Sequence, residues 1–223
     1  MSERSTIEVR KRILEANEEA ARRLRDFFSQ VEALTVNLIS SPGSGKTTLL
    51  EATVDRLSSR YRLAALEGDI ATERDAERLR AMGIPARQIL TGGACHLDAR
   101  QVQKELSEAR FSPFDILFIE NVGNLICPTS YDLGEDFKIA LLSVAEGEDK
   151  PYKYPAIFSR AKATVITKID LLEHVEFDVE AVRTQVKTLN PEGVFLTTSA
   201  RTGNGMDEWI EFLVAALNQK RRL

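Results

Sequence analysis

A glycine-rich stretch in the first quarter of the chain has the residue types of a phosphate-binding loop. Residues 40–48 read Ser-Ser-Pro-Gly-Ser-Gly-Lys-Thr-Thr, between an apolar run at 34–39 and helical spacing at 49–54. Strand, glycine loop, Gly-Lys-Thr and helix are the context that a P-loop requires. Glycines let backbone N–H groups curl around an anion, and the following helix adds the positive end of its dipole.

The members of this loop have separable roles. Lys46 can reach the β- and γ-phosphates, which makes it a catalytic candidate, and the Thr47 hydroxyl can ligate Mg²⁺. Ser40 stands where the motif usually has its first glycine. An ordinary glycine turn is the alternative, but the Lys-Thr pair directly after the second glycine argues against it. The nucleotide-binding candidates here are Gly43, Ser44, Gly45, Lys46, Thr47 and Thr48.

A second motif follows the apolar run at 114–120, which ends in Glu120 and continues as Asn-Val-Gly123. A carboxylate at a strand end suits Mg²⁺, because this hard cation takes oxygen ligands. We therefore predict Glu120 as a catalytic and magnesium-binding residue, and Gly123 as an N–H donor to the γ-phosphate. The alternative is a solvated acidic strand end, and the P-loop makes the functional interpretation the stronger one.

A third motif, Glu-Gly-Asp-Ile-Ala-Thr-Glu-Arg-Asp at 67–75, also follows a strand-like segment. Asp69 is a second candidate ligand for Mg²⁺. Asp75 is a catalytic candidate that could orient the attacking water. For Asp75, helix capping or a surface charge is an almost equally good interpretation.

A fourth motif, Thr167-Lys168-Ile169-Asp170, indicates which base is bound. The Asp170 carboxylate can accept both the N1–H and the N2 amine of guanine, and adenine has no such donor pair. The Lys168 stem can lie along the base, and Ser199-Ala200 could present a backbone N–H to the guanine O6. Lys-x-Asp alone is a weak signal, but after a strand of a P-loop protein it favours GTP over ATP.

Both cysteines of the chain and one of its two histidines fall on two loops. Cys95-His96 and Cys127 offer thiolates and an imidazole, which are ligands for Zn²⁺, Ni²⁺ or copper rather than Mg²⁺. Thiolates bind metals deprotonated, so affinity should weaken as the pH is lowered. The spacing is not that of a zinc finger, and two buried free thiols with a capping histidine are the alternative.

The elements that must position these residues alternate along the chain. Strands are expected at 34–39, 62–69, 88–90, 114–120, 139–144, 163–167 and 194–198, and helices after the P-loop and at 72–81, 97–109, 178–189 and 206–217. This alternation predicts an α/β fold with a mostly parallel sheet covered by helices on both faces. Ligands then gather beyond the carboxyl ends of the strands, where all four motifs and both thiols lie.

The rest of the chain is expected to support one domain spanning 1–223, in which an N-terminal helix (1–30) precedes the nucleotide-binding part (31–223). Residues 5–28 have helical spacing, and the residues expected to face the domain are Val9, Ile13, Ala16, Ala20, Leu24 and Phe27. The polar stretch 146–155 is rich in turn residues and is expected to be a mobile surface segment. Trp209 is expected on the packed face of the last helix.

Composition excludes several classes of function. A chain of 223 residues with a net charge of −4 does not suggest a nucleic-acid-binding protein. It has no apolar stretch of membrane-spanning length and no signal-peptide segment near Met1, so we expect a cytoplasmic protein without a membrane partner. Two cysteines in a reducing compartment do not suggest a structural disulfide. The basic residues at 218–223 are interpreted as a solvated helix end.

Three segments carry a family resemblance: Thr-Gly-Gly-Ala-Cys-His-Leu at 91–97, Glu-Asn-Val-Gly-Asn-Leu at 120–125, and Cys-Pro at 127–128. With the P-loop and Asp170, they resemble the hydrogenase nickel-incorporation GTPases of the HypB family, within the SIMIBI class of P-loop GTPases. The similarity runs from Leu34 to Leu217. The urease accessory GTPase is the nearest relative, but its metal motif is Cys-Pro-His, whereas this chain has Ala94-Cys95-His96.

The resemblance implies a SIMIBI-type G domain that binds GTP or GDP with Mg²⁺, and a metallochaperone that delivers nickel to [NiFe]-hydrogenase. It implies that Cys95, His96 and Cys127 bind Ni²⁺ or Zn²⁺ near the interface of a GTP-dependent homodimer. It also implies two protein partners, a small nickel-binding accessory protein and the hydrogenase large subunit. The Cys-rich motif or His-rich stretch of some family members is not seen here, so this cluster is the only nickel site we expect.

One hypothesis joins the two sites. Cys127 follows closely after Gly123, so binding or loss of the γ-phosphate should move Cys127 and change the metal geometry. Low intrinsic hydrolysis is expected, because no arginine finger or catalytic glutamine can be assigned. The alternatives are a urease-type nickel GTPase, a nucleotide-gated interaction module with structural cysteines, and an ATP-dependent kinase, which Asp170 disfavours.

Overall fold

Within the described residues, seven parallel strands form one sheet whose carboxyl ends face the same edge. The computed structural model describes residues 3–69, 73–109, 111 and 113–222. The strands are β1 Leu34–Ser40, β2 Leu63–Asp69, β3 Ala86–Leu90, β4 Ile116–Glu120, β5 Phe137–Ser143, β6 Ala163–Thr167 and β7 Val194–Thr197. Their order across the sheet is β3-β2-β4-β1-β5-β6-β7. The predicted α/β class is confirmed. Parallel strands must be joined by crossover connections, and these connections place helices on the faces of the sheet.

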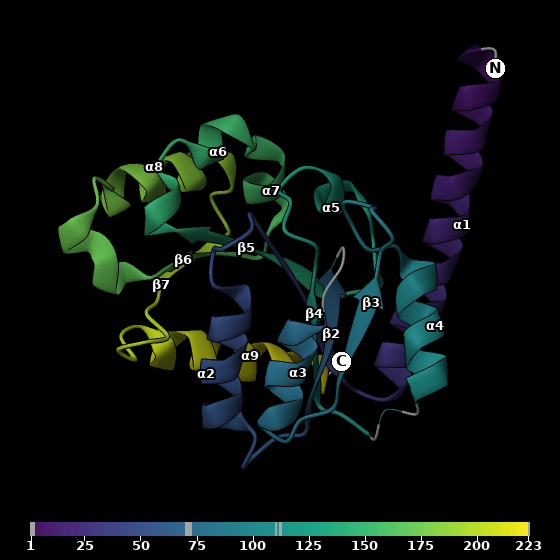
Figure 1. Cartoon of the computed structure of the whole chain (residues 1–223), viewed down its shortest axis with the longest axis horizontal. Helices are drawn as coiled ribbons and strands as arrows, with labels where there is room; N and C mark the ends of the chain where they lie inside the picture. The colour runs from purple at the N-terminus through teal and green to yellow at the C-terminus, as the bar shows by residue number, and fades with distance from the viewer. Residues whose placement is uncertain (1–2, 70–72, 110, 112, 223) are drawn as a thin grey trace.

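Helices cover both faces of this sheet (Figure 1). They are α1 Glu3–Gln30, α2 Lys46–Leu57, α3 Arg74–Ala81, α4 Ala99–Ala109, α5 Cys127–Ser130, α6 Lys150–Lys153, α7 Pro155–Arg160, α8 Val179–Leu189 and α9 Met206–Lys220. Helices α2, α3 and α9 pack on one face, in one apolar cluster with alternate residues of the strands. On the other face, α1 and α4 cover β2 and β4, while α7 and α8 cover β5 and β6.

Strand alternation builds both cores from the same strands. Leu38 faces the α2 side and Ile39 the α7 side, because successive side chains of a strand point to opposite faces. The predicted position of Trp209 is confirmed: its ring is fully buried under α2, and its Nε1 donates to Thr53 Oγ1 at 2.8 Å. The buried indole thus has a partner for its polar group as well as apolar contacts.

Helix α1 is longer than predicted and turns a different side chain to the core. Ala20 and Leu24 are buried as expected, but Phe28 rather than Phe27 enters the core, and Ile13 is 40% exposed. The first turns of α1 extend beyond the sheet in Figure 1. The helical spacing predicted the helix correctly but assigned the wrong phenylalanine to its buried face.

Three further expectations needed correction. The polar stretch 146–155 is largely helical rather than an open loop: it holds the end of a 3-10 turn, Val144–Glu146, then α6 and the start of α7. The helix expected from Leu97 begins at Ala99, because Asp98 Oδ1 accepts the Gln101 N–H at 2.9 Å. The helix expected from Thr72 is described from Arg74, and Thr72 itself lies outside the described residues.

The basic C-terminal end is exposed at Arg221 and Arg222, as expected, but two of its residues also form ion pairs with the domain. Lys220 Nζ lies 2.6 Å from Asp136 Oδ1, and the Arg221 guanidinium contacts Asp115. These pairs fasten the end of α9 to the amino-terminal edge of the sheet, opposite the strand ends that carry the motifs. No helix in the described part of the chain combines the length and apolar character needed to cross a membrane.

Asp115 offers a test of this edge. Its carboxylate accepts the Arg62 N–H at 2.7 Å and Nη2 at 2.8 Å, and these contacts hold the pKa of Asp115 well below its usual range. We expect Asp115→Asn to lower the free energy of unfolding by about 1–2 kcal/mol at pH 7, a modest amount because Arg62 is exposed.

The difference between the two proteins should shrink as the pH falls below about 4. A carboxylate with a depressed folded-state pKa stabilises the fold above its unfolded-state pKa, and this stabilisation is lost as the carboxylate is protonated. Denaturant melts from pH 7 to pH 3, with the exposed-residue control Asp55→Asn, measure it. A gap that is constant across this range would contradict the ion-pair account.

Candidate functional site

The P-loop curls between the end of β1 and the start of α2. Gly43 and Gly45 have φ angles of 75° and 93°, a left-handed conformation that favours glycine. Helix α2 begins at Lys46, so its amino-terminal N–H groups point into the loop. The residues around this curve therefore form a ready cradle for an anion.

Ser40 gives the departure from the usual P-loop sequence a structural explanation. Lys46 is 7% exposed, and its Nζ donates to Ser40 Oγ at 2.9 Å. The Ser40 hydroxyl also bonds the hydroxyl of the fully buried Ser44. A glycine at position 40 would leave the Lys46 ammonium without this partner, so Ser40 holds the side chain at the mouth of the loop.

A group of oxygen atoms lies beside Lys46. Thr47 Oγ1 donates to the two carboxylate oxygens of Glu120 at 3.1 and 3.2 Å, and Glu120 Oε1 is 3.8 Å from Lys46 Nζ. Glu67, in register with Glu120 on the neighbouring strand, is buried beside it, and its Oε1 has no hydrogen-bond partner within the described residues. Mg²⁺ takes oxygen ligands, so this group of hydroxyl and carboxylate oxygens, in which Glu67 Oε1 lacks a hydrogen-bond partner within the described residues, suits that cation.

Sequence reasoning did not assign Glu67, although it lies two residues before Asp69 and so on the same face of β2. Burial, together with the neighbouring Glu120, raises the pKa of Glu67 well above its usual value. Burial also raises the pKa of Glu120, against the opposing effect of Lys46. Two carboxyl groups in this low-dielectric position repel each other when both are ionised, and a divalent cation would relieve that repulsion.

A cavity of ≈ 490 Å³ at the strand ends brings most of the predicted residues together. The predicted residues that line it are Gly43, Gly45, Lys46, Thr47, Thr48, Asp69, Asp75, Glu120, Gly123 and Lys168. Asp75 is in the first turn of α3 but does not cap it, since Glu73 occupies the N-cap position. The capping interpretation of Asp75 is therefore wrong, while its position in the cavity is compatible with the catalytic one.

Arg78, which the sequence analysis missed, also lines this cavity. It follows Asp75 by three residues on the same helix face, and its Nη1 is 3.2 Å from Asp75 Oδ1. Its Nη2 is 2.6 Å from Glu51 Oε2, and this hydrogen bond raises the pKa of Arg78. Arg78 thus adds a second fixed positive charge, besides Lys46, to the lining of the cavity.

A second, smaller cavity of ≈ 250 Å³ lies on the other side of Lys168, between the ends of β6 and β7. Thr167 Oγ1 donates to the Ser44 carbonyl at 2.6 Å, and Lys168 Nζ donates to the Gly43 carbonyl at the same distance. These bonds tie the Thr-Lys-x-Asp segment to the P-loop. Asp170 lines this second cavity, at the place where a base would lie if the phosphates occupied the first.

Ser199 and Ala200 do not contribute equally to this second cavity. The Ser199 N–H donates to the Asn204 carbonyl at 2.8 Å, so that backbone group already has a partner. Its hydroxyl instead donates to Asp170 Oδ1 at 2.6 Å and fixes the direction of the carboxylate. Ala200 lines the cavity and remains the candidate of the pair for contact with the base.

The two thiols and the imidazole converge at the other end of the strand edge. Possible ligand atoms of Cys95, His96 and Cys127 all lie within 4.8 Å of one another, and Cys95 Sγ is 3.6 Å from His96 Nδ1. Cys95 is exposed and Cys127 half-buried, so the alternative of two core cysteines is wrong. This soft-ligand cluster, Cys95, His96 and Cys127, can hold a soft or borderline metal ion.

The environment of the cluster shifts the pKa values of its members in different directions. A hydrogen bond with Cys95, helped by partial burial, raises the pKa of the Cys127 thiol. Partial burial lowers the pKa of His96, which favours the neutral ring that binds metals. Three ligands within one subunit leave a coordination position for another ligand.

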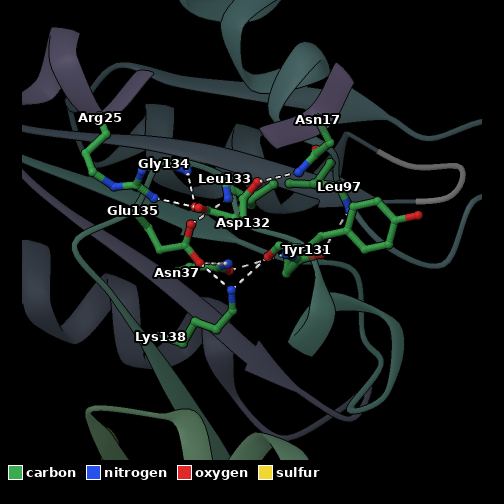
Figure 2. Close-up of polar contacts among 11 residues, drawn as sticks. Asn17, Arg25, Asn37, Leu97, Tyr131, Asp132, Leu133, Gly134, Glu135 and Lys138 are labelled. Atoms are coloured by element: carbon green, nitrogen blue, oxygen red, sulfur yellow. Dashed lines mark hydrogen bonds and ion pairs between the residues drawn. The ribbon is translucent and has the colours of Figure 1, made fainter. Parts of the chain in front are cut away.

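Tyr131 is a neighbour of the cluster that sequence reasoning missed, because it lies in an irregular segment. Its ring centroid is 3.8 Å from that of His96, with an angle of 34° between the planes. The segment that carries it is held by helix α1: Asn17 Nδ2 donates to the Asp132 carbonyl at 2.9 Å (Figure 2). Asn17 Oδ1 accepts the Ala99 N–H at 2.8 Å, so one buried side chain holds the backbone on both sides of the cluster.

The P-loop, the acidic strand ends and the Asp170 cavity on an all-parallel sheet define a P-loop nucleotide-binding protein. Comparison with known proteins narrows this class. Residues 34–197 match the CobW/HypB/UreG nucleotide-binding domain. Hydrogenase maturation factor HypB of Escherichia coli K12 is 47% identical over 213 residues, which are 96% of this chain and 73% of that protein. The chain therefore belongs to the HypB family.

Solved structures agree with this membership. The crystal structure of hydrogenase maturation factor HypB from Archaeoglobus fulgidus matches with a TM-score of 0.86 at 40% identity, covering 92% of this chain and 100% of that one. HypB from Helicobacter pylori in complex with nickel also gives 0.86, at 38% identity, covering 92% and 96%. FlhF complexed with GMPPNP and Mg²⁺, at 16% identity and a TM-score of 0.52, shares the fold alone.

The stacking on His96 can be tested directly. Tyr131→Ala removes the ring, and we expect it to weaken Ni²⁺ binding about three- to tenfold, in line with the loss of one aromatic contact. Tyr131→Phe keeps the ring and should bind like the wild type. Competition titration against a chromophoric chelator gives both affinities, and equal affinities for the two variants would exclude a role for the ring.

Proposed function

We propose that this protein is a slow GTPase that carries nickel for the maturation of [NiFe]-hydrogenase. The observation that carries the proposal is the placement of two chemically different sites on one short segment. Glu120 faces the oxygen-lined cavity, and Cys127, seven residues on, completes the soft-ligand cluster. The relatives in the family are named for hydrogenase maturation, and one of them has been crystallised with nickel.

In this proposal, the nucleotide spans both cavities. The phosphates lie against the P-loop amides, and Lys46 leaves the Ser40 hydroxyl to contact them. The guanine base lies beside Ala200, with its N1–H and N2 donors on Asp170, whose direction Ser199 sets. Asp170 provides specificity, because adenine would leave this carboxylate unpaired.

Hydrolysis needs a water aligned with the γ-phosphate. Asp75 is the candidate to hold it, since its carboxylate lines the cavity that contains Glu120 and Gly123. Mg²⁺, held by Thr47 and Glu120 with Asp69 nearby, would neutralise charge on the phosphate oxygens. We assign no residue of this chain as an arginine finger, and we propose a low intrinsic rate.

Nickel is the cargo in this scheme, and Zn²⁺ is a competitor for the same ligands. Because three ligands per subunit leave the coordination incomplete, a second copy of the chain across a two-fold axis could complete it, which favours a GTP-dependent homodimer. We propose that a nickel-binding accessory protein supplies the ion and the hydrogenase large subunit receives it. The reducing cytoplasm would keep both thiols available.

Urease is a second candidate target. A relative from Helicobacter pylori, 39% identical over 93% of this chain, is named as a hydrogenase/urease maturation factor. The chain lacks the Cys-Pro-His sequence at 94–96, and Cys95-His96 follow an alanine instead. This difference favours hydrogenase as the target.

Base specificity is tested by Asp170→Asn. The asparagine side chain offers one acceptor and one donor. The variant should therefore bind guanine less tightly and bind xanthine, which has an acceptor in place of the N2 amine. We expect GTP binding to weaken by about a hundredfold or more, with XTP becoming the better ligand. Binding of fluorescent nucleotides measures it, and Asp207→Asn, at an exposed position, is the control. Unchanged GTP affinity would remove Asp170 from the base site.

Nickel carriage is tested by Cys95→Ala. We expect this variant to keep its fold and its GTP affinity, because Cys95 is exposed, but to lose at least tenfold in Ni²⁺ affinity. Circular dichroism and Ni²⁺ titration in the GDP and GTP-analogue states measure both properties. A wild type that binds no metal in any state would instead favour a nucleotide-gated interaction module.

A further inference from the structure

The segment from Glu120 to Cys127 lies between the P-loop and the loop that carries Cys95 and His96. On the P-loop side, Glu120 accepts the Thr47 hydroxyl, and Gly123 approaches Pro42 so closely that an added Cβ would lie 2.9 Å from Pro42 Cγ. Any rearrangement of Gly123 toward a γ-phosphate must therefore move this segment as a tightly packed body.

Two carboxamides of the same segment hold the other loop. Asn124 Nδ2 donates to the Cys95 carbonyl at 3.3 Å, and its Oδ1 accepts the Ile126 N–H at 2.8 Å. Asn121 Oδ1 accepts the Leu97 N–H at 3.1 Å and its neighbouring Val122 N–H at 3.0 Å. The peptide groups that follow Cys95 and His96 are thus each bonded to the segment that ends at Cys127.

Leu97 is fixed from its other side as well. Its side chain is fully buried, and it packs so closely over Gly68 of β2 that an added Cβ there would lie 2.8 Å from Leu97 Cγ. The His96–Leu97 peptide therefore has packing against β2 on one side and Asn121 on the other. A displacement of Asn121 would therefore act directly on this peptide, which leads to the imidazole of His96.

A buried polar chain extends the connection from Asn121 to Tyr131. Figure 2 shows its later members, Asn37, Glu135, Lys138 and Tyr131. Asn121 Nδ2 donates to Asn37 Oδ1 at 3.3 Å, and Asn37 Nδ2 donates to Glu135 Oε1 at 3.1 Å. Lys138 Nζ donates to the same Glu135 oxygen at 2.6 Å and to the Tyr131 carbonyl at 2.7 Å. The chain begins next to the phosphate-facing Glu120 and ends at the residue that stacks on His96.

Simple satisfaction of buried polar groups explains part of this network, since buried carboxamides need partners wherever they lie. It does not explain Asn124, which is only half-buried and could reach water. A surface side chain that spans the gap to Cys95 is better explained by the connection it makes.

We propose that Asn121 and Asn124 are positioning residues that transmit the nucleotide state to Cys95 and His96. The inference rests on the proposed nickel function and adds a second route beside the direct covalent one to Cys127. Through these two side chains, all three soft ligands respond together when Gly123 moves. A change of nucleotide state then shifts all three metal ligands together, instead of withdrawing the Cys127 thiol alone.

Asn124 allows a sharp test, because two substitutions separate its bonds. Asn124→Asp keeps the shape and the acceptor for Ile126 but removes the amide donor, which bonds the Cys95 carbonyl and also the Cys127 thiol, while Asn124→Ala removes both the acceptor and the donor. Ni²⁺ affinity is measured in GDP and in a non-hydrolysable GTP analogue, together with the thiolate-to-nickel absorption band. The readout is the ratio of the two affinities, so a charge that strengthens binding equally in both states cancels. Asn218→Ala, at an exposed position of α9, is the matched control.

We expect both Asn124 variants to bring this ratio about three- to tenfold closer to one, the effect of losing one hydrogen bond, with the GTP affinity of the metal-free protein unchanged. The absorption band should also shift less between nucleotide states than in the wild type. A wild-type ratio that differs from one and persists in both variants overturns this inference and leaves the proposed gating intact. A wild-type ratio of one overturns both, while nickel binding by the Cys95 test is judged separately.

Discussion

The alternation of side chains at the end of β4 is the constraint on which the two sites depend. Glu120 and Asn121 are consecutive, so a strand must direct them to opposite faces of the sheet. Glu120 faces α2 and bonds Thr47, while Asn121 faces α4 and bonds the Leu97 N–H. A fixed backbone geometry thus turns one side chain toward the P-loop and its neighbour toward the loop that carries Cys95 and His96, with no flexible linker between them.

The parallel sheet orders the remaining chemistry along the same edge. From β3 to β7 the strand ends offer soft ligands, then carboxylates, then the P-loop, then the segment with Asp170. Oxygen and sulfur donors are therefore kept apart, and these two donor types match the different ligand preferences of hard and softer cations. Buried carboxyl groups of Glu67 and Glu120 would be costly by themselves, and their proximity to Lys46 and to a cation position explains how the fold tolerates them.

The strands, the P-loop and the position of the Asp170 segment after a strand were predicted correctly, because each depends on a contiguous run of residues. Residue chemistry left the grouping of Cys95 with Cys127 open and the family resemblance favoured it, since no local rule brings together loops on strands that are not adjacent. Residues defined by long-range contact were missed: Tyr131 is known only from its stacking on His96. Phe27 was chosen over Phe28 for a similar reason, because the helical period does not show which face meets the sheet.

The side chain of Asn17 has a consequence for how this protein can be divided. It holds the Ala99 N–H and the Asp132 carbonyl, while Gly134 lies so close under α1 that an added Cβ would be 2.7 Å from the Ala21 carbonyl oxygen. Helix α1 is therefore packed and hydrogen-bonded into the part of the domain that carries Cys95, His96 and Cys127, and is not a separate N-terminal extension. A shortened protein that began at β1 would retain every residue of the cavity that Asp170 lines, yet would lose the side chain that holds the backbone on both sides of the soft-ligand cluster.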